Sequence, residues 1–138
     1  MFHPGFAALF AAIPMVAIFA YLGSLFDPGQ DFQNYASQIA VDGTQLAFGD
    51  TKSGPTVVVI GTITNTSPVP WKEIRFHANF FDADGKRTDV GQKEEYDFYL
   101  PARGATSFKV SFRREFPETS YAKYDIRVLT AKDARSRW

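Results

Sequence analysis

The sequence predicts an all-β fold, an antiparallel immunoglobulin-like β-sandwich, preceded by one N-terminal transmembrane helix. Residues 6–26 form a run without a charged side chain. Beyond residue 54, apolar residues recur at about every second position, which is the period of a half-buried strand. We therefore expect an anchor over residues 1–27, a polar connector with a first strand over 28–54, and a sandwich with a basic C-terminal tail over 55–138.

Composition excludes several classes of function. The chain has 138 residues, and its 15 basic side chains balance 15 acidic ones, so no net charge attracts a nucleic acid. Cysteine is absent, which excludes disulfides, thiolate metal sites and cysteine nucleophiles. Without the N-terminal run, about 110 residues remain, a usual size for an immunoglobulin-like sandwich.

The uncharged run Phe6–Phe26 is long enough to cross a membrane. About 21 residues at 1.5 Å each reach roughly 31 Å, the thickness of the hydrocarbon core. A buried soluble helix and a cleaved signal peptide are the alternatives. A signal peptide needs a positively charged N-terminal region, which is missing here. It also needs small residues at its cleavage site, but the bulky Ile18 and Phe19 lie beside the best candidate, Ala20.

Two features of this run favour packing against other transmembrane subunits rather than lipid alone. Pro14 lies in mid-span and frees a backbone carbonyl that a neighbouring helix can accommodate. Small side chains recur at multiples of four positions and let two helices approach closely. These residues are Ala8, Ala12, Ala20 and Ser24. The alternative is a plain anchor, because alanine is common in membrane spans.

The charges that flank the run predict its orientation. No Lys or Arg precedes it, the first one after it is Lys52, and Asp27 and Asp31 follow it closely. This pattern favours a cytoplasmic N-terminus and a periplasmic or otherwise extracytoplasmic C-terminal domain.

Alternating segments separated by turn residues define the expected strands. Ile74, Phe76, Ala78 and Phe80 should face the core, while the residues between them face outward. Asp82–Gly85 follows as a hairpin loop. The expected strands are either Gln38–Val41 or Gln45–Phe48 as the first, then Thr56–Ile63, Ile74–Phe81, Tyr96–Leu100, Thr106–Phe112 and Tyr124–Thr130, with breaks at Pro101–Gly104 and Phe116–Glu118.

Three of these elements resemble the bacterial and archaeal FxLYD domains. Gly61–Asn65 is similar to the strand-ending Gly-x-Val-x-Asn of that family. Phe76–Asp82 is similar to its namesake strand, with Phe81 in place of Tyr. Pro101–Gly104 is similar to its Pro-Pro-Gly turn before a strand that contains Phe.

The resemblance covers about residues 57–128. It implies an immunoglobulin-like sandwich that is usually tethered to a membrane, and it supplies no catalytic residues. The zinc ribbon that precedes the span in some relatives has no counterpart in this chain.

Few residues suggest site chemistry. His77 faces outward without a Gly-x-Ser-x-Gly motif, and His3 is a lone candidate metal ligand. Asp82-Ala83-Asp84-Gly85 resembles the start of a calcium loop, but the position that needs Glu is Lys93, so we interpret it as a turn. Asn65 fits a glycosylation acceptor formally, although closing a strand is the simpler role. We expect no enzyme activity, cofactor or metal.

The remaining candidate site is a basic surface near the C-terminus that could contact an acidic partner or lipid. Its residues are Arg113, Arg114, Arg135, Arg137 and Trp138. The alternative is a solvated tail. The expected function is a non-catalytic, membrane-anchored interaction module, an accessory or assembly subunit of a larger membrane complex. A free-standing envelope protein that binds a ligand or cell-wall component is the alternative.

Overall fold

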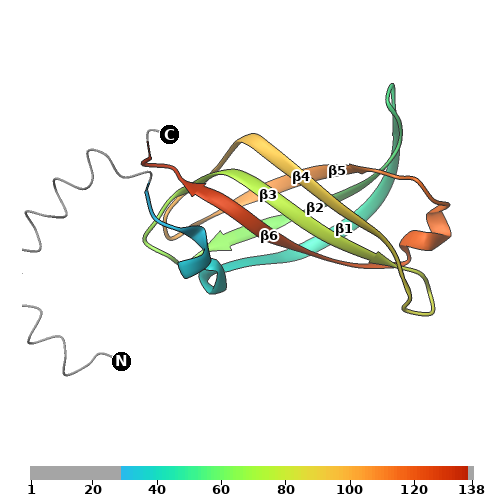
Figure 1. The fold of residues 1–138 in the computed structure, drawn as a ribbon, viewed down its shortest axis with the longest axis horizontal. Helices are drawn as coiled ribbons and strands as arrows, with labels where there is room; N and C mark the ends of the chain where they lie inside the picture. The colour runs from blue at the N-terminus through green and yellow to red at the C-terminus, as the bar shows by residue number, and fades with distance from the viewer. Residues whose placement is uncertain (1–28, 137–138) are drawn as a thin grey trace, which may run out of the picture.

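The computed structural model describes residues 29–136 (Figure 1). This part of the chain contains six β-strands and three short 3-10 helices, joined by loops. The strands are β1 (Ile39–Thr51), β2 (Gly54–Asn65), β3 (Trp71–Phe81), β4 (Arg87–Leu100), β5 (Gly104–Arg113) and β6 (Lys123–Asp133). The 3-10 helices are η1 (Phe32–Asn34), η2 (Ala36–Gln38) and η3 (Glu118–Tyr121).

The expected span Phe6–Phe26 lies outside the described residues, as do Arg137 and Trp138. Within residues 29–136, no helix has the length and apolar character needed to cross a bilayer.

The strands form two antiparallel sheets, in the orders β1-β2-β5 and β4-β3-β6. Their inner faces pack together, and aromatic rings join them: Phe76 stacks on Phe108 with the ring centroids 4.9 Å apart, and Phe80 meets Phe112 edge-on at 5.8 Å. Such contacts between facing sheets are the core of a sandwich. The predicted all-β sandwich is therefore confirmed for the described residues.

Strand β3 shows the alternation that its sequence predicts. Ile74, Phe76, Ala78 and Phe80 are buried, whereas the residues between them are only partly covered. The hairpin after β3 is also confirmed, because Gly85 has a φ of +86°, a conformation that glycine adopts without steric cost.

Strand β1 occupies about half of the region that was expected to be a connector. It pairs with β2 along its whole length, and its register shifts between Asp42 and Gln45. This bulge joins the two alternative first-strand positions into a single strand. Ile39 and Leu46 pack against the core from β1. The folded domain therefore begins ahead of residue 55, where the sequence placed its start.

Candidate interaction surfaces

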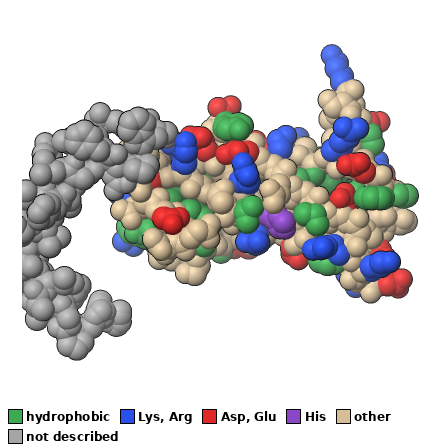
Figure 2. Space-filling view, viewed as in Figure 1, with side chains coloured by type: hydrophobic (Ala, Val, Ile, Leu, Met, Phe, Trp, Pro, Cys, Tyr) green, Lys and Arg blue, Asp and Glu red, His purple; other side chains and the backbone are tan. Residues whose placement is uncertain are grey.

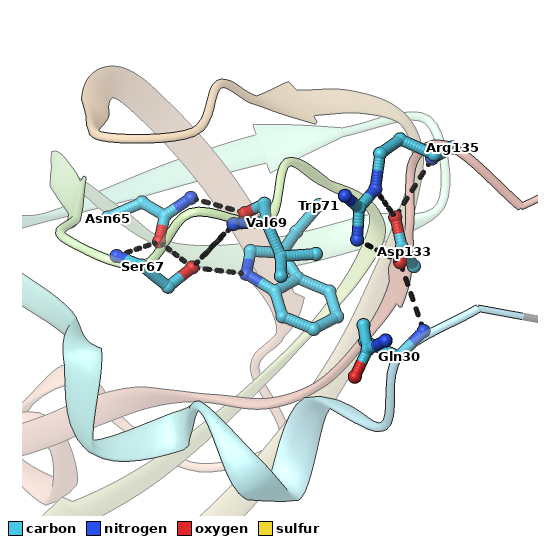
Figure 3. A network of polar contacts seen from close by, with 7 residues as sticks. All are labelled: Gln30, Asn65, Ser67, Val69, Trp71, Asp133 and Arg135. Carbon is cyan, nitrogen blue, oxygen red and sulfur yellow. Dashed lines mark hydrogen bonds and ion pairs between the residues drawn. The ribbon is translucent and has the colours of Figure 1, made fainter. Parts of the chain in front are cut away.

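The loop between β2 and β3 is held by the buried side chain of Asn65, which uses both ends of its amide (Figure 3). Its Nδ2 donates to the carbonyls of Val69 at 2.8 Å and of Pro101 at 3.0 Å. Its Oδ1 accepts from the backbone N–H and the hydroxyl of Ser67. The Nε1 of Trp71 donates to the same hydroxyl. Asn65 thus ties two loops together at one end of the sandwich, which favours its strand-closing role over glycosylation.

At the same end, Asp133 fastens the entry of the chain to the end of β6 (Figure 3). Its Oδ2 accepts from the backbone N–H of Gln30 at 3.0 Å. Arg135 donates to both carboxylate oxygens through Nε and Nη2. Burial alone would raise the pKa of Asp133, but the hydrogen bonds from Arg135 and Gln30 hold that pKa below its ordinary value. Asp133 is therefore a charged, fully bonded clamp on residue 30.

Apolar contacts strengthen this clamp. Phe32 is 3% exposed and meets the buried Trp71 edge-on, with the ring centroids 5.1 Å apart. Tyr35 packs against the same indole at 5.7 Å. The first described residues are thus part of the core rather than a loose linker. We call the contacts of Gln30 and Phe32 with Asp133 and Trp71 the entry clamp.

The two sheets present different outer faces. The outer face of β4-β3-β6 carries many charged side chains, and Figure 2 shows its histidine with blue, red and green side chains around it. Arg75 donates to Glu94 at 2.8 Å, which raises the pKa of Arg75 and lowers that of Glu94. Its other charged members include Lys72, Arg87, Lys123, Asp125, Arg127 and Lys132. Such a face is well solvated.

The outer face of β1-β2-β5 is nearly uncharged. We call it the smooth face. It consists of five rows, and each row contains three residues that pair across β1, β2 and β5. Its charged members are Asp42, Lys109 and Arg113, and Ile60 at its centre is 42% exposed. The other members are Ala40, Gln45, Ala47, Gly49, Thr56, Val58, Thr62, Thr64, Ala105, Ser107 and Ser111. Most of these side chains are small or β-branched, so another surface can approach the sheet closely.

The structure separates the residues of the predicted basic surface. Arg113 and Arg114 lie where β5 ends, next to the β1-β2 hairpin, because Arg113 pairs with Thr56. Arg135 lies at the opposite end, beside the entry clamp, and is engaged with Asp133. Arg114 contacts the ring of Phe48 instead of standing free, with its Cζ 5.5 Å from the ring centroid. The described arginines therefore do not form one surface.

The candidate catalytic and metal residues have structural partners. Nδ1 of His77 lies 3.3 Å from Nε2 of Gln92 on the charged outer face. The carboxylate of Asp82 accepts from the backbone N–H groups of Asp84 and Lys86, the bonding expected for a turn. In the described part of the chain, no group of three or more His, Asp or Glu side chains is placed to hold a metal ion. His3, the lone candidate ligand near the N-terminus, lies outside that part.

Sequence reasoning missed both the entry clamp and the smooth face. The outward residues of β2 do give a signal, because Thr56, Val58, Ile60 and Thr62 alternate without a charge. Asp133 gives none, since its partner Gln30 is 103 residues away.

No family model matches the chain, and no curated protein matches it. A DUF1425 family member from Shewanella sp. pv-4 is similar in structure, with 13% identity over 65% of this chain and 73% of that one, at a TM-score of 0.38. A Northeast Structural Genomics Consortium target is also similar, with 15% identity over 70% of this chain and 85% of that one, at a TM-score of 0.42. Similarities this weak carry no inference about function.

Proposed function

We propose that the protein is a non-catalytic, membrane-anchored interaction module and serves as an accessory or assembly subunit of a larger membrane complex. Its N-terminal run would span the bilayer beside other transmembrane subunits, with the N-terminus in the cytoplasm. The sandwich would lie on the extracytoplasmic side.

The entry clamp is the observation that carries this proposal. The proposed span ends near Phe26, and the backbone N–H of Gln30 is already bonded to Asp133. Four residue steps cover at most about 14 Å. The end of the domain that carries the entry clamp is therefore held close to its own anchor, and contacts made there lie beside that anchor. This suits a subunit that covers part of a neighbouring membrane protein better than a receptor that searches the envelope.

The strand order supports an immunoglobulin-like assignment for the sandwich. If β1, β2 and β5 are equated with strands A, B and E of that fold, then β4, β3 and β6 correspond to C′, C and F. Both sheets then have the strand neighbours of the immunoglobulin fold. The FxLYD resemblance implies the same architecture, and the buried Asn65 gives its Gly-x-Val-x-Asn element a structural purpose.

The test compares matched changes in the span. Replacing Ala12 with Leu puts bulk in the small-residue stripe and should weaken association with a neighbouring helix through steric clash. Phe10→Leu, on a different side, should matter less. The measurement is co-purification in mild detergent followed by native-size analysis. If wild type and both variants migrate as the same small species, the span is only an anchor and the proposal of an accessory subunit fails.

A further inference from the structure

We infer that the smooth face is a contact surface for a second copy of this chain, with the two sandwiches side by side on one membrane. The inference rests on the proposed membrane anchor and names a partner for the extracytoplasmic domain. It leaves the span free to contact other subunits.

The first argument is the chemical difference between the two outer faces. The face of β4-β3-β6 carries ion pairs such as Arg75 with Glu94. On the smooth face, Ile60 is 42% exposed at the centre of the middle strand, and Val58 beside it on β2 is partly exposed. A sheet face with three charged members among its five rows and an exposed apolar side chain at its centre has the character of an interface core.

The second argument is the symmetry that a shared membrane imposes. The strands run along the long axis of the sandwich, and the chain enters at one end of it (Figure 1). Two copies in the same bilayer must have their entry clamps at the same end. A two-fold axis parallel to the strands keeps both entry clamps at the same end. The same axis places β1 of one copy opposite β5 of the other, and β2 of one copy opposite β2 of the other.

The third argument is charge complementarity in that arrangement. Lys109 lies in the row of Ile60, and Asp42 lies in the next row, that of Thr62. Rows on one face are about 6.7 Å apart. Lys109 on β5 therefore lies opposite β1 of the second copy. The Asp42 of that copy is one row away, so the lysine side chain can reach its carboxylate. The axis perpendicular to the strands would instead bring Lys109 opposite Lys109 when Ile60 is centred, which is repulsive.

The contact area explains why the anchor is needed. Three strands about 4.8 Å apart and five rows give on the order of 500 Å² per copy, the low end for specific interfaces. Such a contact is weak in solution. Confinement to one membrane raises the effective concentration, and the same orientation of both copies removes part of the cost of association.

The absence of cysteine makes a clean crosslinking experiment available. Ile60→Cys places one thiol next to the two-fold axis, and His77→Cys places one at the middle of the opposite outer face. The full-length variants are treated in native membranes with a short bis-maleimide, and dimers are separated by mass. Thr62→Cys, one row from Ile60, is a second probe in case the first variant is poorly folded.

The expected result is a crosslinked dimer with Ile60→Cys or Thr62→Cys and none with His77→Cys. Lys109→Asp should reduce the dimer several-fold in the Ile60→Cys background, and adding Asp42→Lys should restore it. A retained, membrane-bound chain that gives only monomer would overturn the inference, as would a crosslink from Ile60→Cys to a different protein. Release of the chain by alkaline carbonate would instead refute the anchor, and with it the shared-membrane arrangement.

Discussion

Replacing Asn65 with Asp tests the network that closes one end of the sandwich. The side chain keeps its shape, but the Nδ2 group that donates to the carbonyls of Val69 and Pro101 becomes an oxygen. An ionised carboxylate would face two carbonyl oxygens in a site that is 1% exposed. We therefore expect the folded state to keep the introduced carboxyl group in its protonated, neutral form, with a pKa above the ordinary value.

The magnitude of the loss follows from two costs. A neutral carboxyl group has one donor for two carbonyls, and the unpaired carbonyl costs about 1–3 kcal/mol. Holding the proton costs about 1.4 kcal/mol per pH unit above the unfolded pKa near 4, or up to about 4 kcal/mol at pH 7. Because the folded-state pKa is raised, the second cost vanishes as the pH falls to about 4. The variant should thus be much less stable at pH 7 and partly recover in acid.

Urea unfolding of the full-length protein in mild detergent measures this effect. The fluorescence of the buried Trp71 is a local reporter, since its indole N–H belongs to the same network. Asn34→Asp, at an exposed position in η1, is the matched control and should change the unfolding free energy little at either pH. A loss for Asn65→Asp that is equal at pH 4 and pH 7, or no loss, would refute the proposed donor role of Nδ2.

Three further substitutions test the core and the entry clamp by the same urea unfolding. Phe76→Ala should lower the unfolding free energy by about 3–5 kcal/mol, because the ring is fully buried, and an unchanged midpoint would contradict its place in the core. Gly91→Ala should cost about 1–3 kcal/mol, because a Cβ there would lie 2.5 Å from the ring of Phe112; a neutral result would show that the ring moves freely. Asp133→Asn should cost about 1–3 kcal/mol at pH 7. The lowered pKa of Asp133 means that its stabilising effect is fully present above about pH 4 and is lost as the pH falls through that lowered pKa, so wild type and variant should converge in strong acid. A difference that stays constant in acid would contradict the clamp.

Local patterns predicted most of the sheet. Strand β3 was predicted with the correct inward face because its apolar residues alternate strictly, and the turns at Gly85 and Pro101–Gly104 carry residues that favour turns. Strand β1 was harder to predict, because the bulge after Asp42 shifts the phase of its alternation, so neither half reaches the length of a full strand.

The candidate surfaces could be predicted far less well. We predicted the basic surface from arginines that lie near one another in the sequence. The strand β6 separates them, because it runs along the length of the sandwich. Arg113 and Arg135 therefore lie at opposite ends. The entry clamp joins Gln30 to Asp133, and no local pattern encodes a contact over that separation. The smooth face becomes visible only once the register of three strands is known.

Alkaline carbonate extraction of membranes tests the central claim most directly. A chain anchored by its N-terminal run should stay in the membrane pellet with its N-terminus intact, because spanning helices resist a wash that removes peripheral proteins. N-terminal sequencing of the retained protein should find residues upstream of Phe6. Recovery of a soluble form that begins near Tyr21 would show a cleaved signal peptide and contradict the membrane-anchored interaction module.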